Sequence, residues 1–252
     1  MTTNFKDHFS GHAADYREFR PDYPPELFAF LASVAAHHDL AWDCGTGSGQ
    51  AAVGLAEYFT RVFATDASAE QVKNAQPHPR VEYAVAPAEK CPLADACVDL
   101  VTVAQALHWF DHDRFYSEVR RVCKPGGLLV VWTYNFHSVN AEVDRVLTRF
   151  RAEFVDAYWP PERMLVETNY STIPFPFEEL PSPAFEMTRE WDLPTLLGYM
   201  RTWSSTTRFE KANGFNPLDR LAADFASAWG DPATTRAVCW AFTVKLGQVN
   251  GK

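Results

Sequence analysis

The sequence contains few cysteines and no closely spaced pair of them. Its five cysteines are odd in number and none belongs to a CxxC motif, which argues against both a disulfide framework and a zinc ribbon. Long hydrophobic runs are also absent: none approaches the ~20 apolar residues that span a bilayer, and the N-terminal segment has no apolar stretch behind its charges. We therefore expect a soluble protein of the reducing cytoplasm with no membrane partner.

Positive charge is scarce as well. The 252 residues include 23 Lys and Arg against 32 Asp and Glu, a formal net charge of −9. A surface with this balance does not favour counterion release from phosphates, so we expect a small molecule rather than nucleic acid as the partner. The hydrophobic fraction of 47% is ample for a core and excludes a disordered chain. The sequence does not fix the oligomeric state, and a monomer is slightly favoured.

The middle of the chain alternates short apolar runs with segments of helical periodicity, which is typical of βαβ units in a parallel sheet. Strands are predicted over residues 40–44, 61–66, 81–86, 98–103 and 127–133. Helices are predicted over 49–58, over 68–75 with Ser68 as the N-cap, and over 114–123. A Pro-Gly-Gly turn is expected to lead into the fifth strand.

Beyond residue 134 this alternation ends. A helical stretch at 139–158 is followed by a proline-rich run, which we interpret as a cap above the sheet. A strand at 184–192, a helix at 194–202 and a last strand at 237–246 are predicted to follow. The fold class is therefore α/β, with a mostly parallel sheet of seven strands, one of which is antiparallel.

The most informative stretch lies where the first strand ends and a helix begins. Gly45, Gly47 and Gly49 let the backbone turn sharply and approach a ligand, while the amides of the helix start face a negative group. Asp66, at the end of the second strand, is placed to accept hydrogen bonds from both hydroxyls of a ribose. The pattern indicates a ligand with a nucleoside and a carboxylate or phosphate. The alternative is a tight turn without a ligand, with Asp66 capping the next helix.

Two further residues of this loop distinguish between nucleoside ligands. A dinucleotide fingerprint requires a third small residue where this chain has Gln50, which disfavours NAD. Asp43, just ahead of the glycines, suits a ligand with an ammonium group. A pyrophosphate has no such group, whereas S-adenosylmethionine has one.

These residues belong to a longer ordered set that resembles class I S-adenosylmethionine-dependent methyltransferases. The set covers roughly residues 5–135 and includes the loop 43–50, the pair Ala88-Glu89, the segment 98–111 and the turn 121–127. Within this superfamily, the Tyr-Arg-Glu-Phe-Arg-Pro segment at 16–21 and the Gln-Ala-Leu-His-Trp-Phe segment that follows the fourth strand resemble the type 11 group. That group contains trans-aconitate methyltransferases. The resemblance implies a Rossmann-like fold with an inserted cap, and S-adenosylmethionine as the cofactor.

The resemblance also implies roles for individual residues. Gly45 and Gly47 are expected along the methionyl part of the cofactor, with Asp43 near its amino group. Asp66 is expected on the ribose and Ala67 beside the adenine. The remaining implied contacts are Ala88 and Glu89 at the adenine edge, Gln105 and Ala106 beside the sulfonium, and Tyr16 and Arg20 in an N-terminal lid.

The same resemblance suggests a single domain over residues 1–252. We divide it into a lid segment (1–38), a cofactor-binding core (39–135), a cap insertion (136–183) and a segment that completes the sheet (184–252).

The chemistry of the methyl acceptor decides which side chains matter. Methyl transfer from a sulfonium is an in-line displacement, so the protein mainly places the nucleophile and excludes water. A carboxylate with a pKa of about 4 is ionised at neutral pH and requires no base, and Arg20 and Tyr134 are candidates to hold it. A phenol or amine would require a base, for which His108 is the candidate.

O-methylation of a carboxylic acid is therefore the preferred function. The alternatives are N-, C- or phenol-O-methylation with His108 as the base, a non-catalytic nucleoside-binding regulatory module and, third, an NAD-dependent dehydrogenase. His108 with His112, and His8 with His12, have the i, i+4 spacing of metal ligands. Neither pair has a third ligand at a diagnostic spacing, so no metal site is expected.

Overall fold

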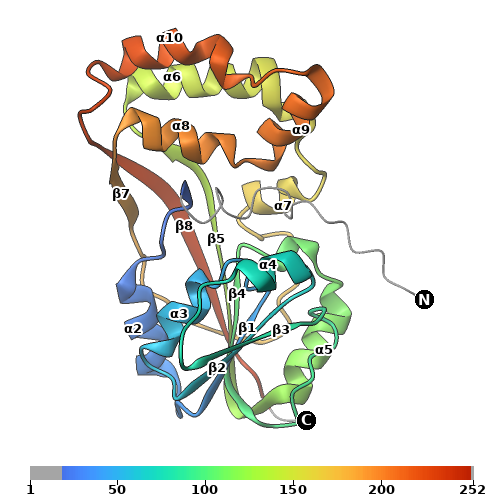
Figure 1. Ribbon diagram of the computed structural model, residues 1–252. Coiled ribbons are helices and arrows are strands. Elements are labelled where there is room, and N and C mark those ends of the chain that lie inside the picture. The colour runs from blue at the N-terminus through green and yellow to red at the C-terminus, as the bar shows by residue number, and fades with distance from the viewer. Residues whose placement is uncertain (1–18, 251–252) are drawn as a thin grey trace.

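The computed structural model describes residues 19–250, and the expectations for Tyr16, His8 and His12 and for most of the N-terminal lid fall outside them. In the described part, a sheet carries helices on both faces, and a second layer of helices lies above the ends of its strands (Figure 1). None of the helices described is long and apolar enough to cross a membrane.

The sheet of residues 19–250 has eight strands. Their order is β3-β2-β1-β4-β5-β8-β6, and β7 also pairs with β8. β8 runs opposite to every other strand, which confirms the predicted mostly parallel sheet with one antiparallel strand. The strands are β1 (Leu40–Cys44), β2 (Arg61–Asp66), β3 (Val81–Val85), β4 (Val98–Ala104), β5 (Cys123–Ser138), β6 (Glu178–Leu180), β7 (Met187–Trp191) and β8 (Arg236–Gln248).

The strand count is one higher than the predicted seven because of β6. This strand has only three residues and comes from the proline-rich run, so it gives no apolar alternation that could be recognised. The 13 residues of β8 are long enough for two short strands to pair with its outer edge. β6 pairs with the Leu246–Gln248 end and β7 with the Arg236–Trp240 end.

Helices cover both faces of the sheet, which explains why the inner strands are near-continuous apolar runs. In β5, Leu128 and Val130 pack with the cluster that includes α2 and α3, whereas Leu129 and Val131 pack with the cluster that includes α5. These helices and the short α4 are α2 (Pro25–Val34), α3 (Gln50–Ala56), α4 (Ala69–Asn74) and α5 (His112–Val122). The carboxyl ends of β1, β2, β4 and β5 therefore meet at one edge of the sheet.

Local sequence signals are confirmed at one helix start and are wrong at one predicted turn. The Ser68 hydroxyl accepts a hydrogen bond from the Gln71 amide and caps α4, as predicted. The Pro-Gly-Gly segment is not a turn before β5, because β5 already begins at Cys123. The register against β4 shifts there, so the segment forms an irregularity within the strand, with Gly126 at a φ of +79°.

The upper helical layer combines two stretches of the chain. It contains α6 (Ala141–Phe150), which continues into a π-helical turn (Arg151–Val155) and a 3₁₀ turn (Asp156–Tyr158), and then α7 (Arg163–Glu167). The later helices are α8 (Leu193–Arg201), α9 (Ser204–Asn213) and α10 (Leu218–Trp229). The helices predicted at 139–158 and 194–202 are present, whereas α2, α9 and α10 were not predicted.

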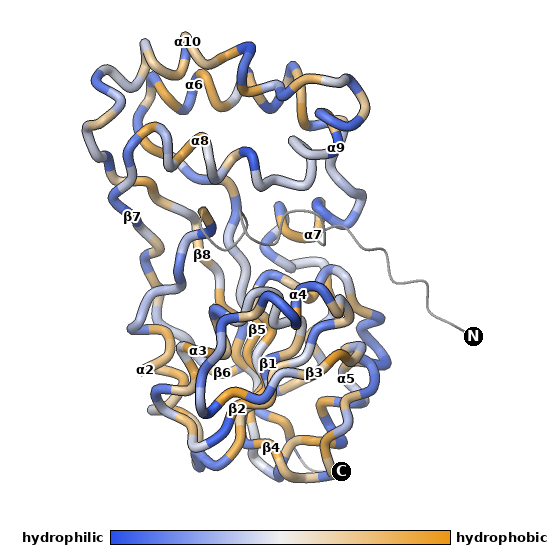
Figure 2. The backbone as a smooth tube through the Cα atoms, in the orientation of Figure 1, coloured by the Kyte–Doolittle hydropathy of each residue, from blue (hydrophilic) through white to orange (hydrophobic). Residues whose placement is uncertain are grey.

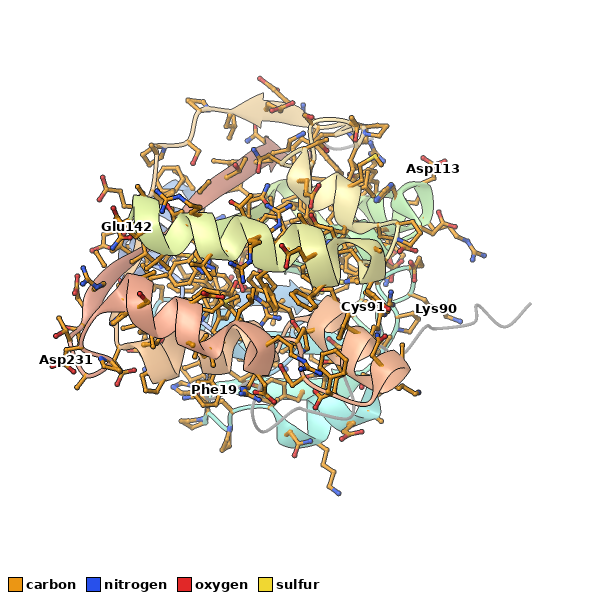
Figure 3. All side chains as sticks on the ribbon, turned by 90° about the horizontal axis from the view of Figure 1, so that it is seen from above. Phe19, Lys90, Cys91, Asp113, Glu142 and Asp231 are labelled. Atoms are coloured by element: carbon orange, nitrogen blue, oxygen red, sulfur yellow. The ribbon has the colours of Figure 1, made fainter. Side chains whose placement is uncertain are left out.

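The apolar sides of these helices form a core of their own. Leu147 and Phe150 of α6 are buried in one cluster with Leu221 and Phe225 of α10, and hydrophilic and hydrophobic residues alternate along α6 in Figure 2. Seen from above in Figure 3, α6 and α10 run side by side. Helices from both 136–183 and 184–252 thus cover the strand ends, although the cap was expected from 136–183 alone.

Candidate functional site

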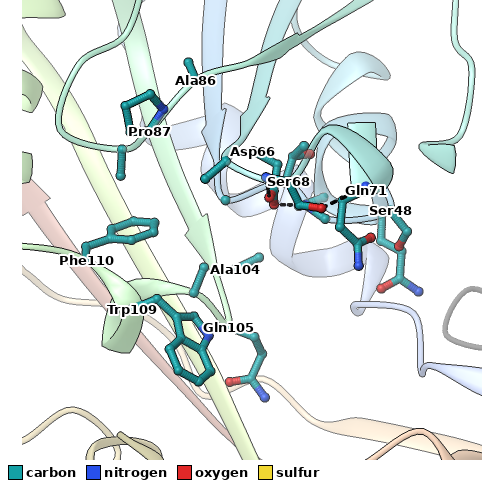
Figure 4. A pocket seen from close by; sticks show the side chains of 18 of the residues that line it. Ser48, Asp66, Ser68, Gln71, Ala86, Pro87, Ala104, Gln105, Trp109 and Phe110 are labelled. Atoms are coloured by element: carbon teal, nitrogen blue, oxygen red, sulfur yellow. Dashed lines mark hydrogen bonds between the residues drawn. The ribbon is translucent and has the colours of Figure 1, made fainter. Parts of the chain in front are cut away.

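A cleft of about 460 Å³ lies at the carboxyl ends of β1, β2 and β4. Figure 4 shows Asp66, Ser68 and Gln71 on one side of it and Trp109 and Phe110 on the other. Eight of the predicted cofactor residues line it: Gly45, Gly47, Asp66, Ala67, Ala88, Glu89, Gln105 and Ala106. The structure therefore brings together residues that are up to 61 positions apart in the sequence.

The glycine loop between β1 and α3 borders this cleft with its main chain. Gly45, Gly47 and Gly49 have φ values of +70°, +53° and +86°, which a side chain would disfavour. A Cβ atom on Gly45 would lie 2.6 Å from the Cβ atom of Ala106, so only glycine allows this loop to approach the end of β4. At Gly45, therefore, both the positive φ and the short distance to Ala106 require glycine.

Asp66 at the end of β2 connects the glycine loop to the next turn. Its carboxylate accepts hydrogen bonds from the main-chain amides of Gly47 and Ser68, both over 2.9 Å. A carboxylate oxygen accepts more than one hydrogen bond, so ribose hydroxyls can share these oxygens with the amides. Ser68, not Asp66, caps α4, which argues against the simple capping role considered for Asp66.

Asp43 differs from its expected position in the cleft wall. Its side chain is fully buried and accepts hydrogen bonds from the hydroxyls of Thr46 (2.6 Å) and Thr102 (2.8 Å). Burial raises the pKa of this carboxyl to about 6. Asp43 is absent from the residues that line the cleft: it belongs to β1, and its buried carboxylate is held by Thr46 of the loop and Thr102 of β4. Its visible role is to hold Thr46, and so the glycine loop, against β4.

The opposite wall depends on Glu89 and Gln105. The Glu89 carboxylate accepts a hydrogen bond from the Asp111 amide over 2.9 Å and thereby ties the loop after β3 to the start of α5. Gln105 donates through Nε2 to the Tyr134 carbonyl over 2.9 Å and accepts from the Thr133 hydroxyl. Because a carbonyl only accepts, the orientation of the Gln105 amide is determined.

A second, smaller cavity of about 80 Å³ shares two wall residues, Gln105 and Trp109, with the cleft. The three predicted acceptor contacts, Arg20, His108 and Tyr134, all line it. No aspartate or glutamate does so in the described part of the chain. The other lining residues are Asn135, Phe136, Trp159, Pro160, Arg163, Val166, Tyr199, Trp203 and Ser204.

An irregularity in β5 accounts for three consecutive residues in this wall. Residues of a regular strand alternate between its faces, yet Tyr134, Asn135 and Phe136 all line the cavity. The pairing with β8 shifts by one residue between Tyr134 and His137. Such a bulge changes the direction of side chains and is common next to active sites.

Arg20 and Arg163 supply the positive charge of this cavity. Arg20 donates to the Tyr134 hydroxyl over 3.2 Å and to the Thr202 carbonyl over 3.3 Å. Arg163 donates to the Asn135 side-chain oxygen over 2.9 Å, and its guanidinium lies 4.2 Å from the ring centroid of Phe136 and 4.8 Å from that of Trp159. Burial lowers the pKa of Arg163 from a value so high that the group stays charged.

Arg163 is the cavity residue that sequence reasoning missed. It begins α7, two residues after the consecutive prolines of the cap, where no pattern suggested a site. The visible signal was its i, i+4 spacing to Glu167, with which it forms an ion pair of 3.5 Å. That spacing is common on the surface of helices and does not indicate a pocket.

His108 follows β4 in the 3₁₀ turn Leu107–Trp109. Its Nδ1 atom lies 2.8 Å from the hydroxyl of Tyr170. Burial, together with the charges of Arg163 and His112, lowers its pKa to about 3. The imidazole is therefore neutral at physiological pH.

Of the two histidine pairs considered as metal ligands, only His108 and His112 lie within the described residues. The Nε2 atom of His112 lies 3.1 Å from the Leu107 carbonyl, a local hydrogen bond. Within residues 19–250, no group of three or more His, Cys, Asp or Glu side chains is placed to hold a metal ion.

Comparisons with known proteins identify the family. The methyltransferase domain family of type 11 matches residues 42–131. A protein named as a methyltransferase from Dictyostelium discoideum is 35% identical over 231 residues, which cover 90% of this chain and 88% of that protein. One from Schizosaccharomyces pombe is 28% identical over 223 residues, covering 84% of this chain and 86% of that protein.

A solved structure is similar over nearly the whole chain. It is named as a type II methyltransferase from Anaeromyxobacter dehalogenans, is 45% identical and superposes with a TM-score of 0.86 over 93% of this chain and 100% of that chain. The mostly parallel sheet, the glycine loop at the end of β1 and the cleft beside it agree with this similarity. The chain therefore belongs to the class I, Rossmann-like family of S-adenosylmethionine-dependent methyltransferases.

Proposed function

We propose that this methyltransferase transfers a methyl group to an oxygen of a small carboxylic acid bound in the second cavity. The observation that carries the proposal is the charge of that cavity: Arg20 and Arg163 line it, and no acidic side chain of the described residues does. Guanidinium groups are suited to carboxylates because their planar donors match the two oxygens.

The larger cleft has the features that the cofactor requires. Asp66 offers carboxylate oxygens for the ribose, Ala88 and Glu89 lie where the adenine is expected, and the main chain of Gly45 and Gly47 borders the methionyl part. When bound, S-adenosylmethionine supplies an electrophilic methyl group on its sulfonium. Gln105 and Ala106 would border that end.

The side chains of the second cavity bind and orient the methyl acceptor. An acceptor carboxylate is already ionised at neutral pH, because its ordinary pKa is about 4. The arginines neutralise and orient it, and the aromatic rings beside them exclude water. The ester product has lost the negative charge, so it binds the same arginines more weakly and can leave.

Methylation of the alternative acceptors would require His108 as a base, and the environment of His108 opposes that role. A general base is most effective when its pKa lies near the working pH, whereas that of His108 is lowered to about 3. N-, C- and phenol O-methylation are therefore second candidates. A non-catalytic nucleoside-binding module is the third, and only product formation separates it from an enzyme.

The experiment incubates the full-length protein with S-adenosylmethionine and a panel of small acids that includes trans-aconitate, together with phenols and amines. Formation of S-adenosylhomocysteine and the mass of the methylated product are measured. We expect methyl esters of one or more acids, and the panel tests the trans-aconitate methyltransferase-like subtype directly. Products from amines or phenols alone would contradict the proposal, and cofactor binding without any product on a broad panel would favour the regulatory module.

A further inference from the structure

The two ring nitrogens of His108 have different surroundings. Nδ1 lies 2.8 Å from the Tyr170 hydroxyl. Nε2 has no hydrogen-bond partner among residues 19–250, although the ring lines the second cavity. An atom of this kind at the wall of a binding cavity is available to a ligand.

We propose that Tyr170 donates its hydroxyl hydrogen to Nδ1 of His108, and that the Nε2–H group fixed in this way donates a hydrogen bond to the acceptor carboxylate. Tyr170 is then a positioning residue, and His108 contacts the acceptor as a neutral donor rather than as a base. This inference rests on the proposed function, because it assigns the acceptor carboxylate to the same cavity.

The burial of Tyr170 leaves its hydroxyl available as a hydrogen-bond donor. Its side chain is 1% exposed, and burial raises its pKa, so the hydroxyl keeps its proton. The Thr133 hydroxyl, which donates its own hydrogen to Gln105, also lies near the Tyr170 hydroxyl. A hydroxyl has one hydrogen to give, and we assign that of Tyr170 to Nδ1 of the neutral imidazole, 2.8 Å away, rather than to Thr133. Neutral imidazole carries one hydrogen, which must then be on Nε2.

The backbone around Tyr170 is held in an unusual conformation. Asn169 and Tyr170 have φ values of +53° and +55°, in the left-handed region that residues with bulky side chains rarely adopt. The Tyr170 amide donates to the Leu165 carbonyl over 2.8 Å, and Lys245 Nζ donates to the Tyr170 carbonyl over 3.0 Å. Strained conformations persist where the surroundings impose them, and they are common at functional sites. Here the imposed turn places a hydroxyl against His108.

The surroundings of His108 keep it a neutral donor. Burial opposes its protonation most strongly, and the charges of Arg163 and His112 add to this effect. The second cavity therefore presents the hydrogens of two guanidinium groups and one imidazole. The Gln105 amide nitrogen donates one of its two hydrogens to the Tyr134 carbonyl. A cavity lined by this many hydrogen-bond donors is suited to a carboxylate.

The first test uses three substitutions of His108 in the full-length enzyme. His108→Gln places an amide N–H near the position of Nε2–H, His108→Asn places it near Nδ1, and His108→Ala removes both. We expect kcat/KM for the best acid to fall about 10- to 150-fold in the Asn and Ala variants, as for a hydrogen bond to a charged group. The Gln variant should recover most of this loss. Affinity for S-adenosylmethionine, measured by calorimetry, should stay within about threefold in all three.

The second test observes the tautomer itself, by ¹⁵N NMR of enzyme labelled in its histidine rings. The His108 signals are assigned as those missing from His108→Gln. We expect the Nε2–H tautomer in the wild type from pH 5 to 8, and a mixture of tautomers in Tyr170→Phe with a raised KM for the acid. An Nδ1–H tautomer in the wild type would overturn the inference, as would an unchanged spectrum and KM in Tyr170→Phe.

The two proposals fail in different ways. Absence of methyl ester from every acid with the wild-type enzyme would contradict the proposed function, whatever the tautomer. Ester formation by the wild type, combined with equal losses in His108→Gln and His108→Asn, would contradict only the role assigned to His108.

Discussion

The side-chain amide of Gln105 donates a hydrogen bond to the main-chain carbonyl of Tyr134 over 2.9 Å and so joins the end of β4 to that of β5. The Thr133 hydroxyl donates to the oxygen of the same amide. Gln105 has a φ of +54°, which is unfavourable for a residue other than glycine. Its side chain lines both cavities, at the place where the proposed methyl donor and acceptor would meet.

We expect Gln105→Leu to lower kcat/KM about 10- to 100-fold, because the Thr133 hydroxyl and the Tyr134 carbonyl lose their partner and the wall shifts. Steady-state kinetics with the best acid measures the effect. Gln248→Leu is the control, since Gln248 pairs with Leu128 at the opposite end of β5. Equal kcat/KM values for the two variants would show that Gln105 does not organise the site.

Arg163→Met should raise the KM for the acid about 10- to 100-fold, because a charge-assisted contact to the carboxylate is lost. Arg163→Lys should recover only part of this loss, since an ammonium group cannot match the planar guanidinium that packs against Phe136 and Trp159. Arg149→Met is the matched control: Arg149 also pairs with a carboxylate, that of Asp224, but it is half exposed on α6. An unchanged KM in Arg163→Met would remove Arg163 from acceptor binding.

Asp66→Asn should weaken binding of S-adenosylmethionine about 10- to 100-fold, measured by calorimetric titration. The amide that replaces one carboxylate oxygen would face the N–H of Gly47 or Ser68, so the glycine loop loses a hydrogen bond as the ribose loses an acceptor. Asp219→Asn serves as the control because its partner, Arg201, lies on the surface. Equal affinities in the two variants would mean that Asp66 serves the loop alone.

Most of the sheet and of the cofactor cleft could be predicted from the sequence, because local patterns determine them. Strands buried on both faces give continuous apolar runs, and the glycine loop and Asp66 follow directly after two of them. The carboxyl ends of parallel strands meet at one edge, so residues that follow different strands share the cleft. Asp43 was the exception, because spacing alone does not tell a buried tether from a residue in the wall.

The second cavity could be predicted only in part, because tertiary contacts assemble it. The predicted fifth strand ended at residue 133, whereas β5 continues to Ser138 and carries Asn135 and Phe136 to the cavity. Arg163 and Tyr170 come from the segment after the consecutive prolines, which has no periodicity. Helix α9 begins with four Ser and Thr residues and offers a weak apolar pattern. The spacing of Leu218, Leu221, Phe225 and Trp229 in α10, in contrast, was a recognisable signal that was missed.

His137 should make the free energy of unfolding depend on pH. It is 4% exposed among Tyr199, Trp203 and Trp240, and neither ring nitrogen has a hydrogen-bond partner in the described chain. Burial lowers its pKa from 6.5 to about 3. Between these values the unfolded chain binds a proton that the folded chain does not, so stability is lost as the pH falls from about 6.5 towards 3.

Urea unfolding of the wild type and of His137→Phe at pH 7.5 and at pH 4.5 measures this contribution. We expect similar stabilities at pH 7.5 and a smaller decline towards pH 4.5 in the variant. His108 and Asp43, whose pKa values are shifted in opposite directions, are present in both proteins and do not affect the difference. Parallel declines in the two proteins would show that His137 is not the group responsible.

If the acceptor atom is a carboxylate oxygen, the bond that the transferred methyl group forms is that of a methyl ester. The full-length enzyme is supplied with S-adenosylmethionine labelled with ¹³C in its methyl group, together with the acid that gives the highest turnover, and the product is examined by NMR. We predict a methyl signal typical of an ester. At an acid concentration that saturates the wild type but not Arg163→Met, we expect the variant to lose this signal. A methyl signal typical of an N-methyl, C-methyl or aryl ether group would show that the acceptor is not a carboxylate oxygen.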